Sequence, residues 1–301
     1  MIRLALGEAL FQQKQLKQSM HETREFNFDP STTTVIASVQ TDAGCVREAN
    51  EDSGRHVSPS DIETQISKGT LTIVADGMGG HASGEVASQM AIELISEAYY
   101  ASSDPSATSA LQDAVERANA AIYQSSLTDE KYFGMGTTVI ALVLQNDKAF
   151  AAHVGDSRLY RMRGGLLELM TMDHSQVMEM VKHGIITFEQ ARHHDDKNVI
   201  LRAVGTQPTV EVEITGPFEI EVGDLFLLCS DGLSDMVEDE EIESILRSEP
   251  NIHLLSDRLI AAAKAKGGHD NITAGLVRVS ARQETEVSSH VRVTREIAAK
   301  E

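Results

Sequence analysis

The chain has few aromatic residues, few cysteines and no tryptophan. Of its 301 residues, 4% are aromatic and two are cysteine, Cys45 and Cys229. Two cysteines so far apart in the sequence exclude a disulfide framework, a zinc ribbon and a closely spaced redox pair. Hydrophobic residues make up 41% of the chain and include 11 methionines, so we expect an aliphatic core partly filled by methionine.

Long apolar segments are also missing. No run approaches the about 20 residues that a membrane-spanning helix needs. Residues 1–8 lack the long apolar region and the cleavage site of a secretory signal peptide. We therefore expect a cytoplasmic protein that does not insert into a membrane.

Positive charge is scarce. The chain carries 26 Lys and Arg residues against 46 Asp and Glu residues, which gives a formal net charge of -20. Such a surface repels phosphate backbones and anionic lipids, so nucleic acids and membranes are not expected partners. The length and the hydrophobic content fit one large domain or two small ones.

Carboxylates are abundant by contrast and recur in five short segments. These are Asn50-Glu51-Asp52, Asp76-Gly77-Met78-Gly79-Gly80, Val154-Gly155-Asp156-Ser157, Ser230-Asp231-Gly232 and Asp270-Asn271. Three of them directly follow a short apolar run, so a sheet would present their carboxylates at one rim. Carboxylate and carbonyl oxygens are the ligands of Mg²⁺ and Mn²⁺. The pattern predicts an oxygen-lined site for divalent cations.

Each segment also has a purely structural interpretation. Asp76-Gly77 can begin a glycine-rich turn, and Asp231 or Asp270 can form Asx turns. Asp156 fits a hairpin corner, and Glu51-Asp52 fits a solvated acidic pair. Their joint occurrence favours a cation site, because converging carboxylates repel one another unless cations neutralise them.

Arg47 is a cation that lies four residues before Glu51 and five before Asp52. A guanidinium beside a two-metal cluster suits bidentate binding of phosphate, although an ion pair with Glu51 or Asp52 is the simpler alternative. Two divalent ions about 3.5–4 Å apart can share a water and lower its pKa, which allows hydrolysis without a side-chain nucleophile. The chain has neither a Cys-x5-Arg phosphatase loop nor a Gly-x4-Gly-Lys-Ser/Thr loop.

Hydrophobic periodicity divides the chain into three parts. Residues 1–33 carry Ile2, Leu6 and Leu10 at four-residue steps, which indicates either a docking helix or a frayed tail. Residues 34–280 form the predicted domain, with a flap at about 174–206, and residues 281–301 form a polar tail.

The elements expected within the domain favour an antiparallel α+β fold. Strands are expected at 35–39, 71–75, 137–144, 148–154, 157–162, 210–214, 225–229 and 272–279. Helices are expected at about 84–100, 107–125, 238–247 and 252–265. Because the strands come as adjacent hairpins, we expect paired helices that pack on an antiparallel sheet or sandwich.

Seven ordered motifs resemble the protein phosphatase 2C (PPM) family, in particular its bacterial serine/threonine phosphatases. The motifs begin at Arg47 and include Val74-Ala75-Asp76-Gly77-Met78-Gly79-Gly80-His81, Gly136-Thr137-Thr138, Val154-Gly155-Asp156-Ser157-Arg158, Asp173-His174-Ser175, Ser230-Asp231-Gly232-Leu233 and Asp270-Asn271-Ile272-Thr273. The resemblance spans about residues 34–280. It implies a four-layer α-β-β-α sandwich of two antiparallel sheets and dependence on Mn²⁺ or Mg²⁺.

By motif position, the resemblance implies metal-ligand roles for Asp76, Gly77, Asp231, Asp270, Asp52, Glu51 and Asp156. Asp76 would bridge two core ions, and Gly77 would bind one of them through its carbonyl. Asp231 and Asp270 would complete the shell of the second ion, while Glu51 and Asp52 would lie in or next to the coordination shell. Asp156 would support a third, weaker ion, and Arg47 would hold the phosphate.

One position departs from the animal members of the family. They have a histidine after the Asp-Gly pair, proposed as a general acid, where this chain has Met78, as bacterial members do. His81 and His153 are candidate proton donors, although each also fits a structural role. A metal-bound water is a third candidate.

The implied function is hydrolysis of phosphoserine and phosphothreonine on proteins by a water that bridges two ions. Such a bacterial enzyme would reverse Ser/Thr kinase signalling, and we expect a monomer whose partners are phosphorylated proteins. Two alternatives stay open. The chain could be a catalytically silent member that binds phosphoproteins, or a phosphatase of a partner-switching regulator such as an antagonist of an anti-sigma factor.

Overall fold

The structure is a computed structural model that describes residues 33–79 and 83–281. The expected helix within residues 1–33, the polar tail and His81 lie outside the described residues, apart from Thr33 and Ala281 at the two ends. Within the described ranges, no helix is long and apolar enough to cross a membrane.

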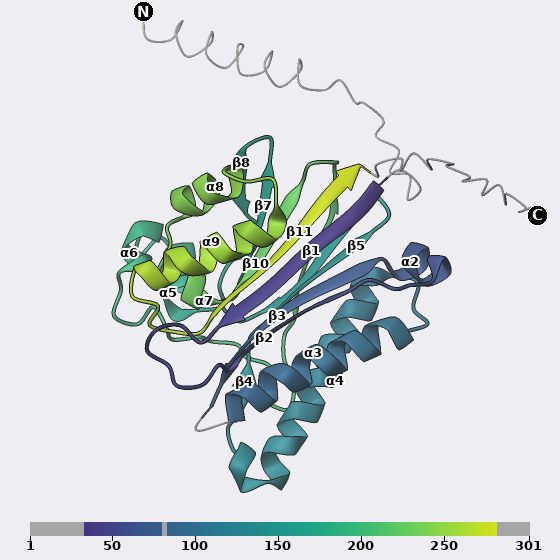
Figure 1. Cartoon of the computed structure of the whole chain (residues 1–301). Coiled ribbons are helices and arrows are strands. Elements are labelled where there is room, and N and C mark those ends of the chain that lie inside the picture. Colours follow the sequence, from purple (N-terminus) through teal and green to yellow (C-terminus); the bar gives the residue numbers. More distant parts are fainter. Residues whose placement is uncertain (1–32, 80–82, 282–301) are drawn as a thin grey trace, which may run out of the picture.

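The strands form two antiparallel sheets (Figure 1). The first sheet has the order β1 (Thr33–Asp42), β11 (Ile272–Ala281), β10 (Leu225–Cys229), β7 (Arg158–Arg163) and β8 (Leu166–Leu169). The second has the order β2 (Asp52–Val57), β3 (Thr70–Met78), β5 (Val139–Gln145), β6 (Lys148–Val154) and β9 (Glu213–Glu219), and the short β4 (Gly136–Thr137) pairs with β3.

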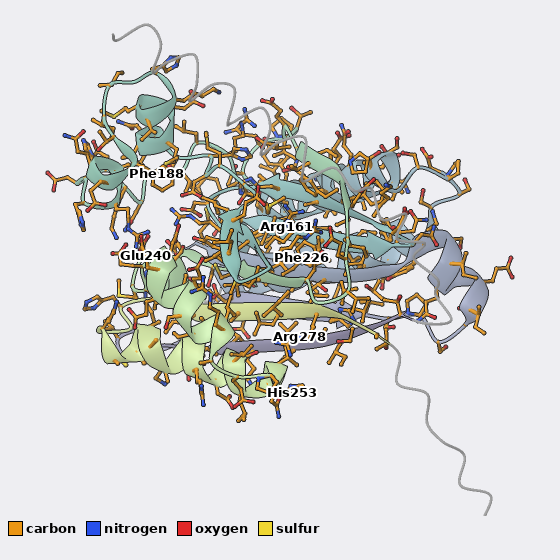
Figure 2. All side chains as sticks on the ribbon, turned by 90° about the horizontal axis from the view of Figure 1, so that it is seen from above. Arg161, Phe188, Phe226, Glu240, His253 and Arg278 are labelled. Carbon is orange, nitrogen blue, oxygen red and sulfur yellow. The ribbon has the colours of Figure 1, made fainter. Side chains whose placement is uncertain are left out.

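Paired helices cover the outer face of each sheet, which gives four layers (Figure 1). α3 (Ser83–Ala101) and α4 (Ala107–Thr128) pack on the second sheet, and α8 (Asp239–Arg247) and α9 (Ile252–Ala265) pack on the first. Between the sheets lies a separate apolar layer that includes Val74 and the fully buried Phe226 (Figure 2). The expected α-β-β-α sandwich is confirmed.

Alternation along β3 shows how one strand serves two cores. Ile73 and Ala75 belong to the core under α3 and α4, whereas Val74 faces the other sheet. This follows from the two-residue period of side chains in a strand. A strand buried on both faces reads as a continuous apolar run, which is the pattern at residues 71–75.

Several elements differ from the sequence-based expectation. The structure adds β2, β8, α2 (Ile62–Lys68) and the four-residue α7 (Asp231–Ser234), and β9 begins at Glu213 rather than at residue 210. Two short helices, α5 (Gln176–Lys182) and α6 (Phe188–Arg192), lie in the segment predicted as a flap. Figure 2 shows Phe188 on this segment, away from the sheets.

Candidate active site

Antiparallel pairing gathers the five acidic segments at one end of the two sheets. Asp52 begins β2 and is paired in register with Asp76 near the end of β3. Asp156 follows β6, Asp231 follows β10, and Asp270 precedes β11. One cleft is lined by the predicted residues Arg47, Glu51, Asp76, Gly77, Asp156, Asp231 and Asp270. The expected convergence of these side chains is therefore present in the structure.

Asp52 lies below the cleft and is buried, with 5% of its surface exposed. Its Oδ2 accepts hydrogen bonds from the hydroxyls of Ser230 and Thr273, each at 2.7 Å. Its Oδ1 has no hydrogen-bond partner among the described residues. Burial raises the pKa of Asp52 to about 6, because the charged form loses its solvation.

Asp76 and Asp231 are the most strongly perturbed acids of the cleft. Burial raises both pKa values well above the ordinary range, and neighbouring carboxylates raise them further. Asp231 also has a buried Oδ1 without a hydrogen-bond partner in the described part of the chain. The backbone of Asp76 is fixed by its N–H, which donates to Thr138 Oγ1 at 2.9 Å, and by its carbonyl, which accepts from Thr138 N at 2.8 Å.

Gly77 permits a close approach between β3 and the start of α3. Its N–H donates to the carbonyl of Glu51 at 3.1 Å, and a Cβ at this position would collide with the carbonyl of Gly84. Burial raises the pKa of the Glu51 carboxyl, while Arg47 and a hydrogen bond from the Gly84 backbone act against this shift. Glu51 thus faces the cleft and also contacts the first turn of α3.

Arg47 pairs with Asp270 rather than with Glu51 or Asp52, the partners considered for a simple ion pair. Its Nη2 lies 2.7 Å from Asp270 Oδ2, and 53% of the Arg47 side chain is exposed. Hydrogen bonding to Asp270 raises the pKa of Arg47, so its positive charge is secure. The guanidinium therefore stands at the mouth of the cleft, where a solute can reach it.

The loop that carries Arg47 is held by a side chain whose role sequence reasoning missed. Asn271 donates to the carbonyls of Ala43 and Ala49, at 3.1 and 2.9 Å, and accepts from the N–H of Glu51 at 2.8 Å. Asn271 was noticed only as the neighbour of Asp270. Its bonds to a loop some 220 positions away leave no signal in local sequence.

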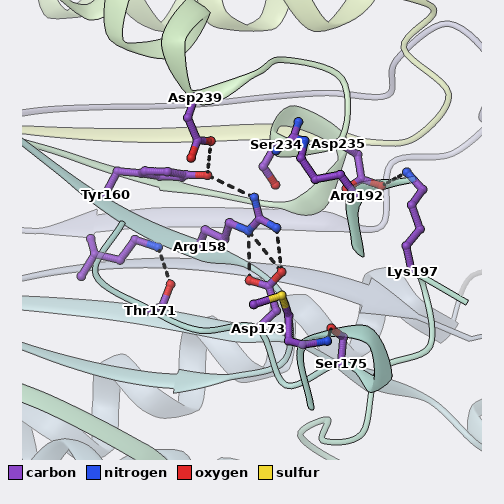
Figure 3. Close-up of polar contacts among 12 residues, drawn as sticks. Arg158, Tyr160, Thr171, Asp173, Ser175, Arg192, Lys197, Ser234, Asp235 and Asp239 are labelled. Atoms are coloured by element: carbon purple, nitrogen blue, oxygen red, sulfur yellow. Dashed lines mark hydrogen bonds and ion pairs between the residues drawn. The ribbon is translucent and has the colours of Figure 1, made fainter. Parts of the chain in front are cut away.

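Asp156 lies near the buried ion pair of Arg158 and Asp173. Burial raises its pKa to about 7, and the negative charges of Asp173 and Asp235 add to the effect. Arg158 binds Asp173 with two prongs, Nε to Oδ1 at 2.9 Å and Nη2 to Oδ2 at 2.7 Å (Figure 3). Both residues stood in recognised motifs, but no function had been predicted for either.

The flap is tied to α7 beside the cleft (Figure 3). Lys197 Nζ lies 2.6 Å from Asp235 Oδ2, and Arg192 Nη2 donates to the carbonyl of Ser234 at 3.0 Å. Asn198 and Ile200 of the flap line the same cleft as the acids. The segment predicted to influence access therefore forms one wall of the site.

The chain is similar to known proteins along most of its length. Residues 60–272 match the family model for protein phosphatase 2C. The chain is 38% identical to the serine/threonine phosphatase stp of Listeria monocytogenes over 80% of this chain and 94% of that protein. The serine/threonine phosphatase PstP/Ppp of Mycobacterium tuberculosis matches with a TM-score of 0.73 at 36% identity, covering 82% and 99% of the two chains. The chain belongs to the protein phosphatase 2C family.

Two sequence-based predictions are confirmed by these relatives: the family, and the enzyme class of protein-serine/threonine phosphatase. A further solved structure is relevant to the cleft. The catalytic domain of the serine/threonine protein phosphatase PstP, in complex with two manganese ions, matches with a TM-score of 0.70 at 35% identity, covering 83% of this chain and all of that one.

Of the two candidate proton donors, the structure describes only His153. Its ring is fully buried and stacks on His174 with 4.5 Å between the ring centroids. Burial lowers the pKa of His153 to about 3, so the ring is neutral. His153 does not line the cleft of this phosphatase 2C domain, and its predicted function as a proton donor gains no support from this position.

Proposed function

We propose that this chain hydrolyses phosphoserine and phosphothreonine in proteins at the acidic cleft, with two divalent cations, Mn²⁺ or Mg²⁺, held by the cleft residues. The observation that carries the proposal is the convergence of Asp76, Asp231 and Asp270 with Arg47 at one cleft. Acids alone would repel a phosphate group, whereas a site of cations and one guanidinium would attract it.

The residues present fit hard divalent cations. The cleft offers carboxylates and the Gly77 carbonyl, and the described residues that line it include neither histidine nor cysteine. Asp52 and Asp231 each hold a buried oxygen without a hydrogen bond within the described ranges, which is costly unless another group binds that oxygen. The raised pKa values of Asp76 and Asp231 show how strongly their negative charges need compensation.

The motif positions divide this ligand set into roles that we carry forward as a proposal. Asp76 would bridge the two ions, Gly77 would contribute its carbonyl, and Asp231 and Asp270 would hold the second ion. Asp52 and Glu51 would lie in or next to the coordination shell of these ions. Asp156 would hold a third, weaker ion. When bound, such ions neutralise phosphoryl charge and acidify a bound water.

Arg47 would bind and orient the phosphate. Its exposed guanidinium matches the geometry of two phosphate oxygens, and the pair with Asp270 holds it over the cleft. The flap residues Asn198 and Ile200 would face the substrate from the opposite wall. The proton donor to the leaving serine or threonine oxygen is not assigned to a described histidine.

The substrates would be proteins phosphorylated by a Ser/Thr kinase, and the chain would act as a monomer. We place its action in the cytoplasm, because both cysteines are free thiols in the structure, one exposed and one buried. The surplus of negative charge supports protein substrates over nucleic acids.

The test is release of phosphate from a phosphothreonine peptide, and of p-nitrophenol from p-nitrophenyl phosphate, in Mn²⁺ or Mg²⁺. Turnover should vanish with excess EDTA and in the Asp231→Asn variant. Asp147→Asn is a matched control, because Asp147 lies in the turn between β5 and β6, at the end of β6 opposite to Asp156. Full turnover in EDTA, or in Asp231→Asn, would refute the proposal. Tight peptide binding without turnover would favour a silent phosphoprotein-binding member.

A further inference from the structure

A single residue, His174, binds the turn that presents Asp156. Gly155, which directly precedes Asp156, donates its N–H to His174 Nδ1 at 3.1 Å. The backbone N–H of His174 returns a hydrogen bond to the Gly155 carbonyl at 2.8 Å. Both polar backbone groups of Gly155 are therefore bound by one residue, at the first position of the flap.

The hydrogen bond from Gly155 requires a His174 ring whose Nδ1 carries no proton. A backbone N–H can only donate, so Nδ1 accepts and the hydrogen of the neutral ring lies on Nε2. Burial lowers the pKa of His174, which keeps the ring neutral. Nε2 lies 3.2 Å from Glu213 Oε2 on β9, so the ring donates to this carboxylate. Glu213 thus selects the tautomer that can accept from Gly155.

Two further contacts hold this arrangement in place. His153 stacks on the His174 ring at an interplanar angle of 28°, which limits rotation of the ring. On the other side of the turn, Ser157 Oγ and Thr138 Oγ1 are 2.7 Å apart. Gly155 itself has a φ of 110°, and a Cβ there would lie 2.6 Å from the methyl group of Thr138. Contacts with His174 on one side and with Thr138 on the other therefore hold the turn in place.

We propose that Glu213 and His174 are positioning residues, which act through Gly155 to aim the Asp156 carboxylate into the cleft. This inference rests on the proposed function, in which Asp156 binds the weakest of the cations. Glu213 lies outside the cleft lining, yet it controls the hydrogen bond that sets the turn. The flap begins at His174, so the same two residues couple the base of the flap to Asp156.

The same side chains are less suited to hold a metal ion of their own. The candidate ligand atoms of His153, His174 and Glu213 lie within 4.8 Å of one another. However, His174 Nδ1 already accepts from Gly155, and Nε2 lies 3.4 Å from the guanidinium of Arg202. A cation at Nε2 would have to displace a proton beside this positive charge.

The experiment compares variants of the full chain. Glu213→Leu removes the acceptor, Glu213→Gln keeps an oxygen that can accept from Nε2, and His174→Asn keeps an acceptor near the position of Nδ1. Glu219→Gln is the matched control, because Glu219 is an exposed carboxylate of the same strand that pairs with Lys148 and contacts neither His174 nor Arg202. The readouts are Mn²⁺ binding by calorimetry, the ¹⁵N shifts of the His174 ring and the Gly155 amide resonance.

In the unchanged chain, the His174 ring should show the single Nε2–H tautomer. In Glu213→Leu the tautomers should mix, the Gly155 amide should shift, and affinity at the weakest Mn²⁺ site should fall by about 10-fold, as is usual for partners of ligand-bearing segments. Glu213→Gln should recover most of that loss, His174→Asn should retain part of the affinity, and Glu219→Gln should bind as the unchanged chain does.

Normal Mn²⁺ affinity and an unshifted Gly155 amide in a folded Glu213→Leu protein would overturn the inference. So would an equal loss in Glu219→Gln, which would reveal a general charge effect. Asp76→Asn separates this failure from failure of the proposed function: if it too binds Mn²⁺ normally, the cleft is not the metal site.

Discussion

At the scale of single residues, the cleft concentrates opposing demands on its carboxylates. Asp76 and Asp231 are needed as anions by a cation, while burial and mutual repulsion favour their protonated forms. Arg47 is the only positively charged side chain among the described residues that line this cleft. A single substitution of one of these acids should therefore weaken cation binding without destabilising the metal-free protein.

Asp76→Asn should remove cation binding and turnover together, because Asp76 lies opposite Asp52 and beside Gly77 at the centre of the cleft. We expect Mn²⁺ affinity to fall by more than about 100-fold, beyond the usual cost of losing a residue that only supports a ligand. The metal-free variant should be at least as stable as the unchanged chain, since one buried carboxyl group is gone. Calorimetry and thermal unfolding measure the two effects. A metal-free variant that is less stable than the unchanged chain would contradict this view of the cleft.

Arg47→Ala should weaken binding of phosphopeptide and inorganic phosphate. The loss should be about 10-fold or more in KM, the range for hydrogen bonds to a charged group. Arg47→Lys should restore only part of it, because an ammonium cannot bind two oxygens in the fork geometry. Steady-state kinetics with phosphate as an inhibitor measure both. An unchanged KM in Arg47→Ala would show that Arg47 does not bind the phosphate and only forms the ion pair with Asp270.

At the scale of elements, helices and strands differ in how well their sequence signals describe them. On α4 the helical period places Leu111, Val115, Ala118 and Ile122 on one face, and all four are fully buried. On α3 the same period places Val86, Met90, Leu94 and Ala98 on one stripe, which is only partly buried. The fully buried positions there include Ala87, Ala91 and Ile95. Small residues let α3 lie close to its neighbours, so the larger side chains flank the contact rather than form it.

Strand β9 shows the limit of alternation as a signal. Val210, Val212 and Ile214 alternate as a strand would, and they pack against the core under α3 and α4. Pairing with β6 nevertheless begins only at Glu213. Alternation reports which side chains are buried, whereas the strand begins where a partner backbone is available. For the same reason α7, with four residues, was too short for periodicity to reveal.

The flap and α7 should open more readily when their ion pair is removed. Lys197→Gln breaks the contact with Asp235, in which about a third of each side chain is exposed. Such pairs contribute about 0.2–1 kcal/mol, so amide exchange in α5 and α6 should rise by up to about fivefold. Lys182→Gln is the control, because Lys182 pairs with Glu179 of its own helix. Equal amide exchange in Lys197→Gln and Lys182→Gln would show that the Lys197–Asp235 pair does not hold the flap against α7.

At the scale of the whole molecule, the convergence of the acids could be predicted, whereas the hydrogen bonds and ion pairs that hold the surrounding loops could not. Ordered motifs and strand–acid–glycine segments predicted the acids that line the cleft. The clamp by Asn271, the Arg158–Asp173 pair and the bonds from His174 to Gly155 join segments that are distant in sequence or lie outside any strand pairing. Their partners are set by the relative placement of the two sheets, which local patterns do not encode.

The metal-free protein should lose stability as the pH rises. Folding raises the pKa of Asp52 from 3.8 to about 6 and that of Asp156 from 3.8 to about 7. A carboxyl group with a raised pKa binds more protons in the folded state, so its stabilising contribution is complete below pH 3.8 and is lost as the pH rises to about 7.

A divalent cation should reverse this loss. Mg²⁺ or Mn²⁺ should raise the melting temperature more at pH 7.5 than at pH 5, because protons compete with the cation at low pH. Differential scanning fluorimetry with EDTA as the reference measures the difference. A cation-induced shift that is independent of pH would indicate that cations bind away from these carboxylates.

The central claim is that the acids around Asp76 hold the cations that make this chain a phosphatase. The most direct measurement is anomalous diffraction at the manganese absorption edge, from crystals of the full chain grown with Mn²⁺. We expect two strong peaks in the cleft, with the Asp76 carboxylate between them and the Gly77 carbonyl beside one. A cleft without peaks in crystals of protein that is active with Mn²⁺, or peaks confined to His153, His174 and Glu213, would contradict it.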